Sequence, residues 1–102
     1  MSANFEELIS KVKEYGKKKV SVAVAEDAPI LEAVEEARKQ GFADAILVGD
    51  EAKIREIAAG LNIDLTPYEI INEQDHWQAA LKAVKLEHAG VADMYMNGLI
   101  DT

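Results

Sequence analysis

The sequence predicts an α/β protein, a three-layer αβα sandwich built on a mostly parallel sheet. Two observations predict it: four short apolar runs have the composition of strands, and four stretches with helical spacing of apolar residues alternate with them. The runs are Val20–Val24, Ala45–Val48, Tyr68–Ile71 and Met94–Met96. Because each helix returns the chain to the start of the sheet, neighbouring strands are expected to run parallel. Residues 1–102 are expected to form one domain with no internal linker.

The first helix is predicted over residues 4–15, with the first strand soon after it. Apolar side chains recur three and four positions apart in this helix, at Phe5, Leu8, Ile9 and Val12. Gly16 follows, where a left-handed helix end is usual. The strand that begins at Val20 is apolar at nearly every position and rich in β-branched residues, as expected for an inner strand covered on both faces. We expect it at the centre of the sheet.

The second helix is predicted to begin after Asp27 and to end at Gly41. Asp27 is of a residue type that caps helices, and Pro29 fits the first turn, where no amide hydrogen is needed. Arg38 and Lys39 near the end match the negative end of the helix dipole. The buried stripe is expected at Ile30, Ala33, Val34 and Ala37.

The second strand leads through Gly49 to Asp50, another capping residue, so a third helix is predicted over residues 51–60. Its buried residues are expected to be Ile54, Ile57, Ala58 and Leu61. A loop containing Pro67 separates this helix from the third strand. The fourth helix ends at Gly90 and is predicted from the apolar residues Trp77, Ala80, Leu81, Ala83 and Val84. The side chains expected in the core also include Tyr68, Trp77, Met94 and Met96.

Two nine-residue segments repeat along the chain, Gly41–Gly49 and Gly90–Gly98. Each contains a glycine that ends a helix, one apolar residue, the pair Ala-Asp, a strand and a final glycine. This order suits a chain that leaves a helix, buries one side chain while it reverses, and enters a sheet. Asp44 and Asp93 are accordingly interpreted as turn residues that accept backbone hydrogen bonds.

The composition argues against several classes of function. With 19 acidic and 11 basic residues the net charge is −8, whereas nucleic-acid binding needs a clustered basic face. The basic cluster Lys17–Lys19 is interpreted as a solvated turn. The absence of cysteine excludes disulfides, thiolate zinc sites and a cysteine nucleophile. No apolar run approaches the ~18 residues of a membrane helix, so a cytoplasmic protein without membrane contacts is expected.

Any ligand is expected at the carboxyl edge of the sheet, where parallel strands end together. The segments that end there are Ala25–Asp27, Gly49–Asp50, Asn72–Glu73 and Asn97–Gly98. None is followed by a Gly-x-Gly-x-x-Gly motif or a Gly-Lys-Ser/Thr loop, which argues against a nicotinamide or nucleoside-triphosphate site. Glu26 and Asp27 are the candidate acid pair for metal binding or proton transfer, although helix capping alone would account for Asp27.

The other reactive residue types do not form a known catalytic pattern. His76 and His88 lie at opposite ends of the fourth helix, too far apart to share a metal, and both are interpreted as structural. Ser10 and Ser21 fall inside a helix and a strand, with no histidine motif in support. We predict no catalytic residue, no metal site and no permanently bound cofactor in this chain.

Taken together, four segments resemble the N-terminal part of phosphate butyryltransferases, members of the phosphate acetyl/butyryltransferase family. They are Val20–Asp27, Ala43–Asp50, Lys53–Ala58 and Ala92–Ile100, and the resemblance covers essentially the whole chain. It implies an enzyme that moves an acyl group between coenzyme A and inorganic phosphate. It also implies a two-domain αβα fold with the active site between the domains, and assembly as a homo-oligomer.

The chain is expected to be only the N-terminal part of such an enzyme. The last strand is followed by a few residues and no covering helix, and the resemblance assigns acyl transfer to a serine, an arginine and an aspartate of a later portion. The family's Met-Lys-Gly-Leu motif has Asn97 in place of lysine here, so a neutral amide replaces a positive charge. The resemblance therefore implies an inactive fragment in which one wall of a substrate cleft is lined by Glu26, Asp27, Asn97 and Gly98.

Two other functions remain open. A phospho-receiver signalling module would carry an acidic pair after its first strand, but it needs a fifth strand and an acceptor aspartate where this chain has Asn72 and Glu73. A small standalone binding or scaffolding domain would use the fold without catalysis and unfold cooperatively as a monomer. A truncated domain would instead self-associate through exposed apolar residues, expected at Met94, Met96, Leu99 and Ile100.

Overall fold

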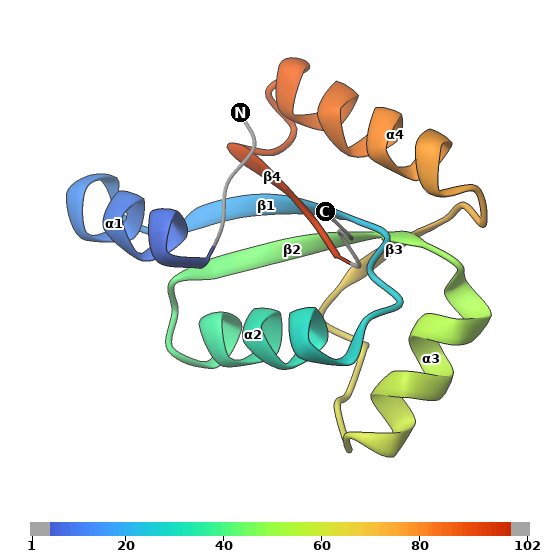
Figure 1. The fold of residues 1–102 in the computed structure, drawn as a ribbon. Helices are drawn as coiled ribbons and strands as arrows, with labels where there is room; N and C mark the ends of the chain where they lie inside the picture. Colours follow the sequence, from blue (N-terminus) through green and yellow to red (C-terminus); the bar gives the residue numbers. More distant parts are fainter. Residues whose placement is uncertain (1–4, 99–102) are drawn as a thin grey trace.

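A four-stranded sheet lies between helices on both of its faces in the computed structural model, which describes residues 5–98 (Figure 1). The elements, in chain order, are α1 (Phe5–Tyr15), β1 (Lys18–Ala23), α2 (Ala28–Lys39), β2 (Ala43–Gly49), α3 (Glu51–Gly60), β3 (Glu69–Asn72), α4 (His76–His88) and β4 (Met94–Asn97). Each helix and strand predicted from the sequence is present within a few residues of its expected position. Within the described range, no helix combines the length and the apolar character needed to cross a membrane.

β1 is an inner strand of the sheet, as its apolar run predicts. The strands lie in the order β3-β2-β1-β4, and every neighbouring pair is parallel. Val22 of β1 lies opposite Leu47 of β2 on one side and Met96 of β4 on the other, and all three side chains are buried. The carboxyl ends of β2 and β4 therefore flank the carboxyl end of β1.

Two hydrophobic cores, one on each face of the sheet, produce the three layers. One core receives Leu8 from α1, Leu31 from α2 and Ile54 from α3. The other receives Ala79 and Ala83 from α4, whose small side chains let this helix lie close to the sheet. Figure 1 accordingly shows α4 on one side of the sheet and α2 on the other.

The helices begin and end at the residues that the sequence marks for this purpose. Gly16, Gly41 and Gly90 follow α1, α2 and α4 with φ angles of 86°, 77° and 78°. This left-handed conformation suits glycine because it has no Cβ atom. The Asp50 carboxylate accepts the amide hydrogen of Lys53 at 3.3 Å, as expected of a cap at the start of α3.

Trp77 does not lie in the core, and its predicted burial is wrong. Its side chain is 70% exposed on the first turn of α4, whereas Ala79 and Ala83 of the same helix are buried. Residues two positions apart on a helix point about 200° away from each other. Trp77 therefore faces away from the sheet when Ala79 faces it. The predicted burial of Tyr68 is confirmed.

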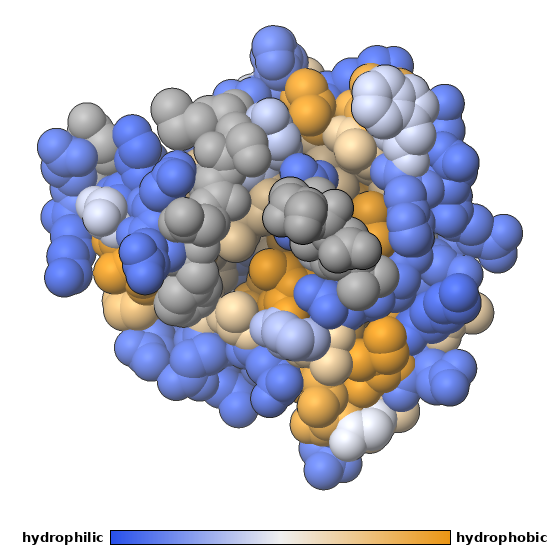
Figure 2. Space-filling view, in the orientation of Figure 1, coloured by the Kyte–Doolittle hydropathy of each residue, from blue (hydrophilic) through white to orange (hydrophobic). Residues whose placement is uncertain are grey.

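The two methionines of β4 are buried as well, which confirms their predicted place in the core. Met94 and Met96 are 2% and 4% exposed, so neither adds to an exposed apolar surface. Leu99 and Ile100 lie outside the described residues. Figure 2 shows apolar side chains reaching the surface of one face among hydrophilic ones. Self-association of the chain stays a prediction.

Glu35 is a buried carboxylate that the apolar pattern of α2 does not predict. The buried residues of this helix are Leu31, Val34, Glu35 and Ala37, whereas Ile30 and Ala33 are only partly buried. The Glu35 carboxylate accepts hydrogen bonds from Arg38 Nε at 3.0 Å and from the Tyr68 hydroxyl at 2.6 Å. The bond from Arg38 holds the pKa of Glu35 below its ordinary value, and burial raises the pKa of Tyr68. These contacts tie α2 to the residue before β3.

The two repeated segments contain β2 and β4, but their aspartates have different roles. Asp93 accepts the backbone amide hydrogen of Lys19 at 2.8 Å, which confirms its interpretation. Asp44 lies inside β2, and its carboxylate pairs with the Lys17 ammonium group at 3.2 Å on the surface. Lys18 and Lys19, interpreted as part of a turn, are the first residues of β1, so that interpretation is wrong for them.

Ser21 joins β1 to α4 and is a structural residue. Its side chain is completely buried, and its hydroxyl donates a hydrogen bond to the carbonyl oxygen of Ala83 at 2.8 Å. Replacing Ser21 with alanine is expected to lower the unfolding free energy by about 1 kcal/mol, because a buried hydrogen bond is lost. Urea unfolding measures the change, with Ser10→Ala on the exposed side of α1 as the matched control. Equal midpoints for the two variants would contradict this expectation.

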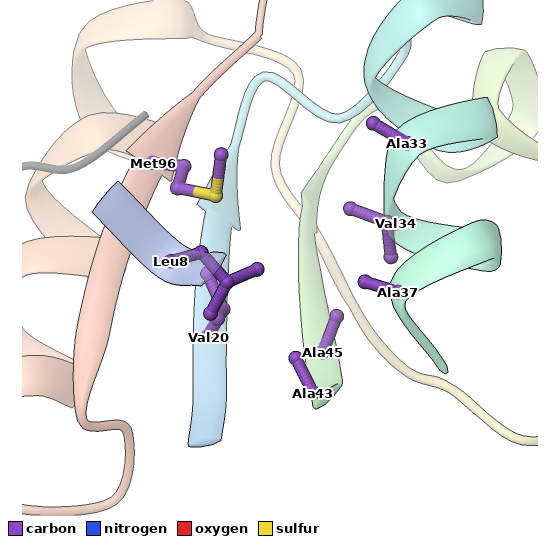
Figure 3. A pocket seen from close by; sticks show the side chains of 8 residues that line it. All are labelled: Leu8, Val20, Ala33, Val34, Ala37, Ala43, Ala45 and Met96. Atoms are coloured by element: carbon purple, nitrogen blue, oxygen red, sulfur yellow. The ribbon is translucent and has the colours of Figure 1, made fainter. Parts of the chain in front are cut away.

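The cavity between α2 and the sheet is apolar and too small for a substrate (Figure 3). Its volume is about 10 Å³, no more than about one water molecule needs. Side chains from α1, α2 and three strands converge on it, namely Leu8, Val20, Ala33, Val34, Ala37, Ala43, Ala45 and Met96. This cavity is part of the hydrophobic core.

Candidate functional site

The carboxyl ends of all four strands meet at one edge of the sheet, as predicted. Across the sheet, this edge carries Asn72–Glu73, Gly49–Asp50, Ala25–Asp27 and Asn97–Gly98. The amide of Glu73 donates to the carbonyl oxygen of Gly49, and the amide of Gly98 to that of Ala23, both at 2.7 Å. α2, α3 and α4 begin at the same edge, so their N-terminal ends bring partial positive charge to it.

Glu26 is a buried acid at this edge. Its side chain is 6% exposed, and its Oε1 atom has no hydrogen-bond partner among residues 5–98. The carboxylate lies across Gly49, because a Cβ atom on that glycine would stand 2.1 Å from Glu26 Oε1. Gly49 therefore leaves the space that Glu26 occupies. A buried acceptor without a donor is uncommon in proteins and marks a residue whose partner has to be sought.

His76 lies beside Glu26, although the two residues are far apart in the sequence. Its Nε2 atom is 3.9 Å from Glu26 Oε2, and its side chain is 64% exposed. The Asp75 carboxylate accepts the amide hydrogen of Gln78 at 2.8 Å and so starts α4 at His76. A single sequence cannot reveal this pair, since only the packing of α4 against β1 brings the two side chains together. The capping pattern of Asp75 is the one local signal, and it places His76 on a helix start.

Asp27 stands on the other side of the end of β1. It occupies the N-cap position of α2, but its side chain makes no capping hydrogen bond, so the capping interpretation of its carboxylate is wrong. A Cβ atom on Gly98 would stand 3.3 Å from Asp27 Cβ and 2.3 Å from the carbonyl oxygen of Val24. Val24 itself has a φ angle of 53°, which is rare for a β-branched residue. The turn that leaves β1 is thus packed tightly against Gly98.

Asn72 and Glu73, at the other end of the edge, have partners within the fold. Asn72 accepts the amide hydrogen of Glu51 at 3.0 Å through its side-chain oxygen. The Lys82 ammonium group lies 2.9 Å from the Glu73 carboxylate and lowers the pKa of Glu73. Asn97 is half-buried at the end of β4, opposite Ala23.

The chemistry available at this edge suits binding of a polar ligand. Glu26 and Asp27 approach different neighbouring strands, and among residues 5–98 no group of three or more histidine or acidic side chains is placed to hold a metal ion. The edge offers the Glu26 carboxylate oxygen that faces His76, the exposed imidazole of His76 and the N-terminal ends of three helices. Such a set favours a ligand that carries negative charge and can also donate a hydrogen bond.

Comparison with known proteins shows extensive similarity. Residues 4–86 match the family described as Phosphate acetyl/butaryl transferase. The chain is 55% identical over 102 residues to a phosphate butyryltransferase of Clostridium beijerinckii, and 53% identical over the same length to one of Clostridium acetobutylicum. Each match covers 100% of this chain and 34% of the relative, so the chain spans about a third of the length of these relatives.

A solved structure shares the fold. The EutD phosphotransacetylase from Staphylococcus aureus is similar with a TM-score of 0.68 and 23% sequence identity. The similarity covers 98% of this chain and 40% of that one. The arrangement of helices around the parallel sheet is therefore one that is also found in a larger protein.

Proposed function

Because the chain belongs to the phosphate acetyl/butaryl transferase family, we propose that it is the N-terminal part of an acyltransferase that moves an acyl group between coenzyme A and inorganic phosphate. The observation that carries this proposal is the 55% identity over all 102 residues to a phosphate butyryltransferase. Neither a receiver module nor a standalone scaffolding domain accounts for that identity. Residues 1–102 are, in this proposal, one incomplete αβα domain of the parent enzyme.

We place one wall of the substrate cleft at the carboxyl edge of the sheet. The wall is formed by Glu26, Asp27, Asn97 and Gly98. Its support is the register that puts the end of β4 beside the end of β1, together with the general position of binding sites in parallel sheets. The groups that break and form the acyl bond belong to the part of the parent enzyme outside this chain.

The proposed partners of the parent enzyme are small molecules, acyl-coenzyme A and phosphate. Coenzyme A acts as a substrate and not as a permanently bound cofactor. The net charge of −8 supports a protein without nucleic-acid partners. We further propose a homo-oligomer, as the family resemblance implies, and a cytoplasmic location without membrane contacts, as the composition predicts.

A chimera tests the proposed function. The first 102 residues of the Clostridium beijerinckii relative are replaced with this chain, since the two are 55% identical over that length. The chimera is expected to convert butyryl-coenzyme A and phosphate to butyryl phosphate, because this chain supplies the wall of the cleft that the replaced residues formed. The free thiol of coenzyme A that appears measures the rate. This chain alone is expected to show no turnover above background.

The same chimera tests the role of Asn97. Asn97→Lys restores the positive charge of the family motif and is expected to strengthen binding of anionic coenzyme A, with Asn62→Lys on an exposed turn as the matched control. A chimera that folds but has no activity would contradict the proposed function. An Asn97→Lys variant with unchanged affinity for coenzyme A would contradict the assignment of Asn97 to the cleft.

A further inference from the structure

Glu26 and His76 form a pair that leaves its hydrogen-bonding capacity unused. The 3.9 Å between His76 Nε2 and Glu26 Oε2 is longer than a hydrogen bond, whose N–O distance is about 2.7–3.2 Å. The other carboxylate oxygen of Glu26 has no partner in the described part of the chain. The pair therefore presents an acceptor next to a potential donor, and neither satisfies the other.

The surroundings of this pair define the ligand that would fit it. His76 is the first residue of α4, so helix amides and the positive end of the helix dipole lie on its side of the pair. His76 is also 64% exposed, which opens the pair to solvent from that side. An anion would be attracted there. A fully deprotonated anion, however, would place its oxygen lone pairs against those of the Glu26 carboxylate, and the two acceptors would repel each other. The ligand must accept from His76 and donate to Glu26.

We propose that Glu26 and His76 together bind a phosphate group that keeps one proton. The imidazole N–H donates to an unprotonated phosphate oxygen, and the P–O–H group donates to Oε2 of Glu26, the carboxylate oxygen on the His76 side. No covalent bond changes in this step. The choice of phosphate as ligand rests on the proposed function, whereas the requirement for a donor rests on Glu26 Oε2, the carboxylate oxygen that faces His76 at 3.9 Å.

Sulfate distinguishes this arrangement from simple charge attraction. It has the shape of phosphate but carries no proton at neutral pH, so it cannot donate to Glu26. The site is therefore expected to prefer phosphate over sulfate by about tenfold or more, the factor typical of one hydrogen bond to a charged group. Inorganic phosphate is the expected source of the group, because it keeps a proton at pH 7, whereas a phosphate monoester such as the 3′-phosphate of coenzyme A has a second pKa of about 6 and is mainly the unprotonated dianion.

The test is a titration of the 102-residue chain at pH 7, followed by NMR, with inorganic phosphate, sulfate and adenosine 3′-monophosphate. Shifts of the His76 ring and the Glu26 amide are expected with inorganic phosphate. Sulfate and adenosine 3′-monophosphate, which is mainly the unprotonated dianion at this pH, are expected to bind about tenfold more weakly. No measurable binding of inorganic phosphate, or equal binding of phosphate and sulfate, would overturn the proposal.

Two variants and their controls locate the effect. Glu26→Gln keeps the size of the side chain but adds a donor, so the preference for phosphate over sulfate should fall about tenfold. If only the loss of negative charge mattered, the binding of phosphate and of sulfate would be strengthened alike. The ratio of the two affinities would then be unchanged, and this result would contradict the proposal. His76→Gln is expected to change the affinity for phosphate. His88 lies at the other end of α4 and has its own carboxylate neighbour at 3.9 Å, so His88→Gln should leave that affinity unchanged.

This test is independent of acyl transfer. An inactive chimera with an intact phosphate preference in the chain would contradict the proposed function and leave the Glu26–His76 site in place. An active chimera, together with a chain that shows no preference for phosphate over sulfate, would support the proposed function and overturn the Glu26–His76 site. Circular dichroism of each variant confirms that the fold is retained before the ratios are compared.

Discussion

Replacing Gly98 with alanine is expected to destabilise the protein by about 3 kcal/mol, near the upper end of overpacking effects. The added Cβ atom would stand 2.3 Å from the carbonyl oxygen of Val24, which is backbone and cannot turn aside. Val24 is already held at a φ angle of 53°, so this turn has little freedom to relax. Urea unfolding of the variant and the wild type measures the loss.

Two other glycines provide matched controls for Gly98. Gly60 at the end of α3 has open space around its Cβ position, so Gly60→Ala is expected to stabilise the protein by up to about 1 kcal/mol. Gly49→Ala is expected to cost less than Gly98→Ala, because its nearest contact is the end of the Glu26 side chain. If Gly98→Ala unfolded at the same urea concentration as Gly60→Ala, the tight packing of Gly98 against the Val24 carbonyl group would be disproved.

Replacing Glu35 with alanine is expected to lower the unfolding free energy by about 2–3 kcal/mol at pH 7, because it removes the acceptor of two buried or half-buried donors. The Tyr68 hydroxyl loses its bond of 2.6 Å, and Arg38 loses its bond of 3.0 Å. Arg38 also lies 5.8 Å above the ring of Tyr68, so its position depends on both partners. Glu51→Ala, in an exposed ion pair with Arg55, is expected to cost under about 0.5 kcal/mol.

The contribution of Glu35 is expected to depend on pH in a defined direction. Its pKa is lowered in the folded protein by the hydrogen bond from Arg38, so the folded state favours the ionised form. That stabilisation is complete above the ordinary pKa of 4.5 and is lost as the pH falls through the lowered folded value. The stability difference between wild type and Glu35→Gln should therefore shrink below pH 4.5. A constant difference over that range would contradict the ion pair.

The helices and strands were predictable because their signals are local. Alternating strand-like and helical patterns, Asp50 as a cap and glycines at helix ends each act within a few residues. The central place of β1 followed from an apolar run that needs cover on both faces. The parallel arrangement then brought the predicted segments to one edge.

The error at Trp77 has a cause that lies outside the helix itself. The environment of this side chain depends on how α4 is rotated against the sheet. In α4 the face that contains Ala79 and Ala83 is buried, although Trp77 is the larger apolar residue. Small side chains allow close packing of helix and sheet, and this outweighs the burial of one large ring. Local spacing alone does not determine this rotation.

The sequence by itself determined the order of the elements, the parallel sheet and the edge at which a ligand is expected, because these depend on patterns within single helices and strands. Only the tertiary structure decided that Glu26 lies across Gly49 with an unpaired oxygen, and that His76 stands beside it. These contacts join the ends of β1 and β2 to the start of α4. They depend on the way separate elements pack, which no local pattern of residues encodes.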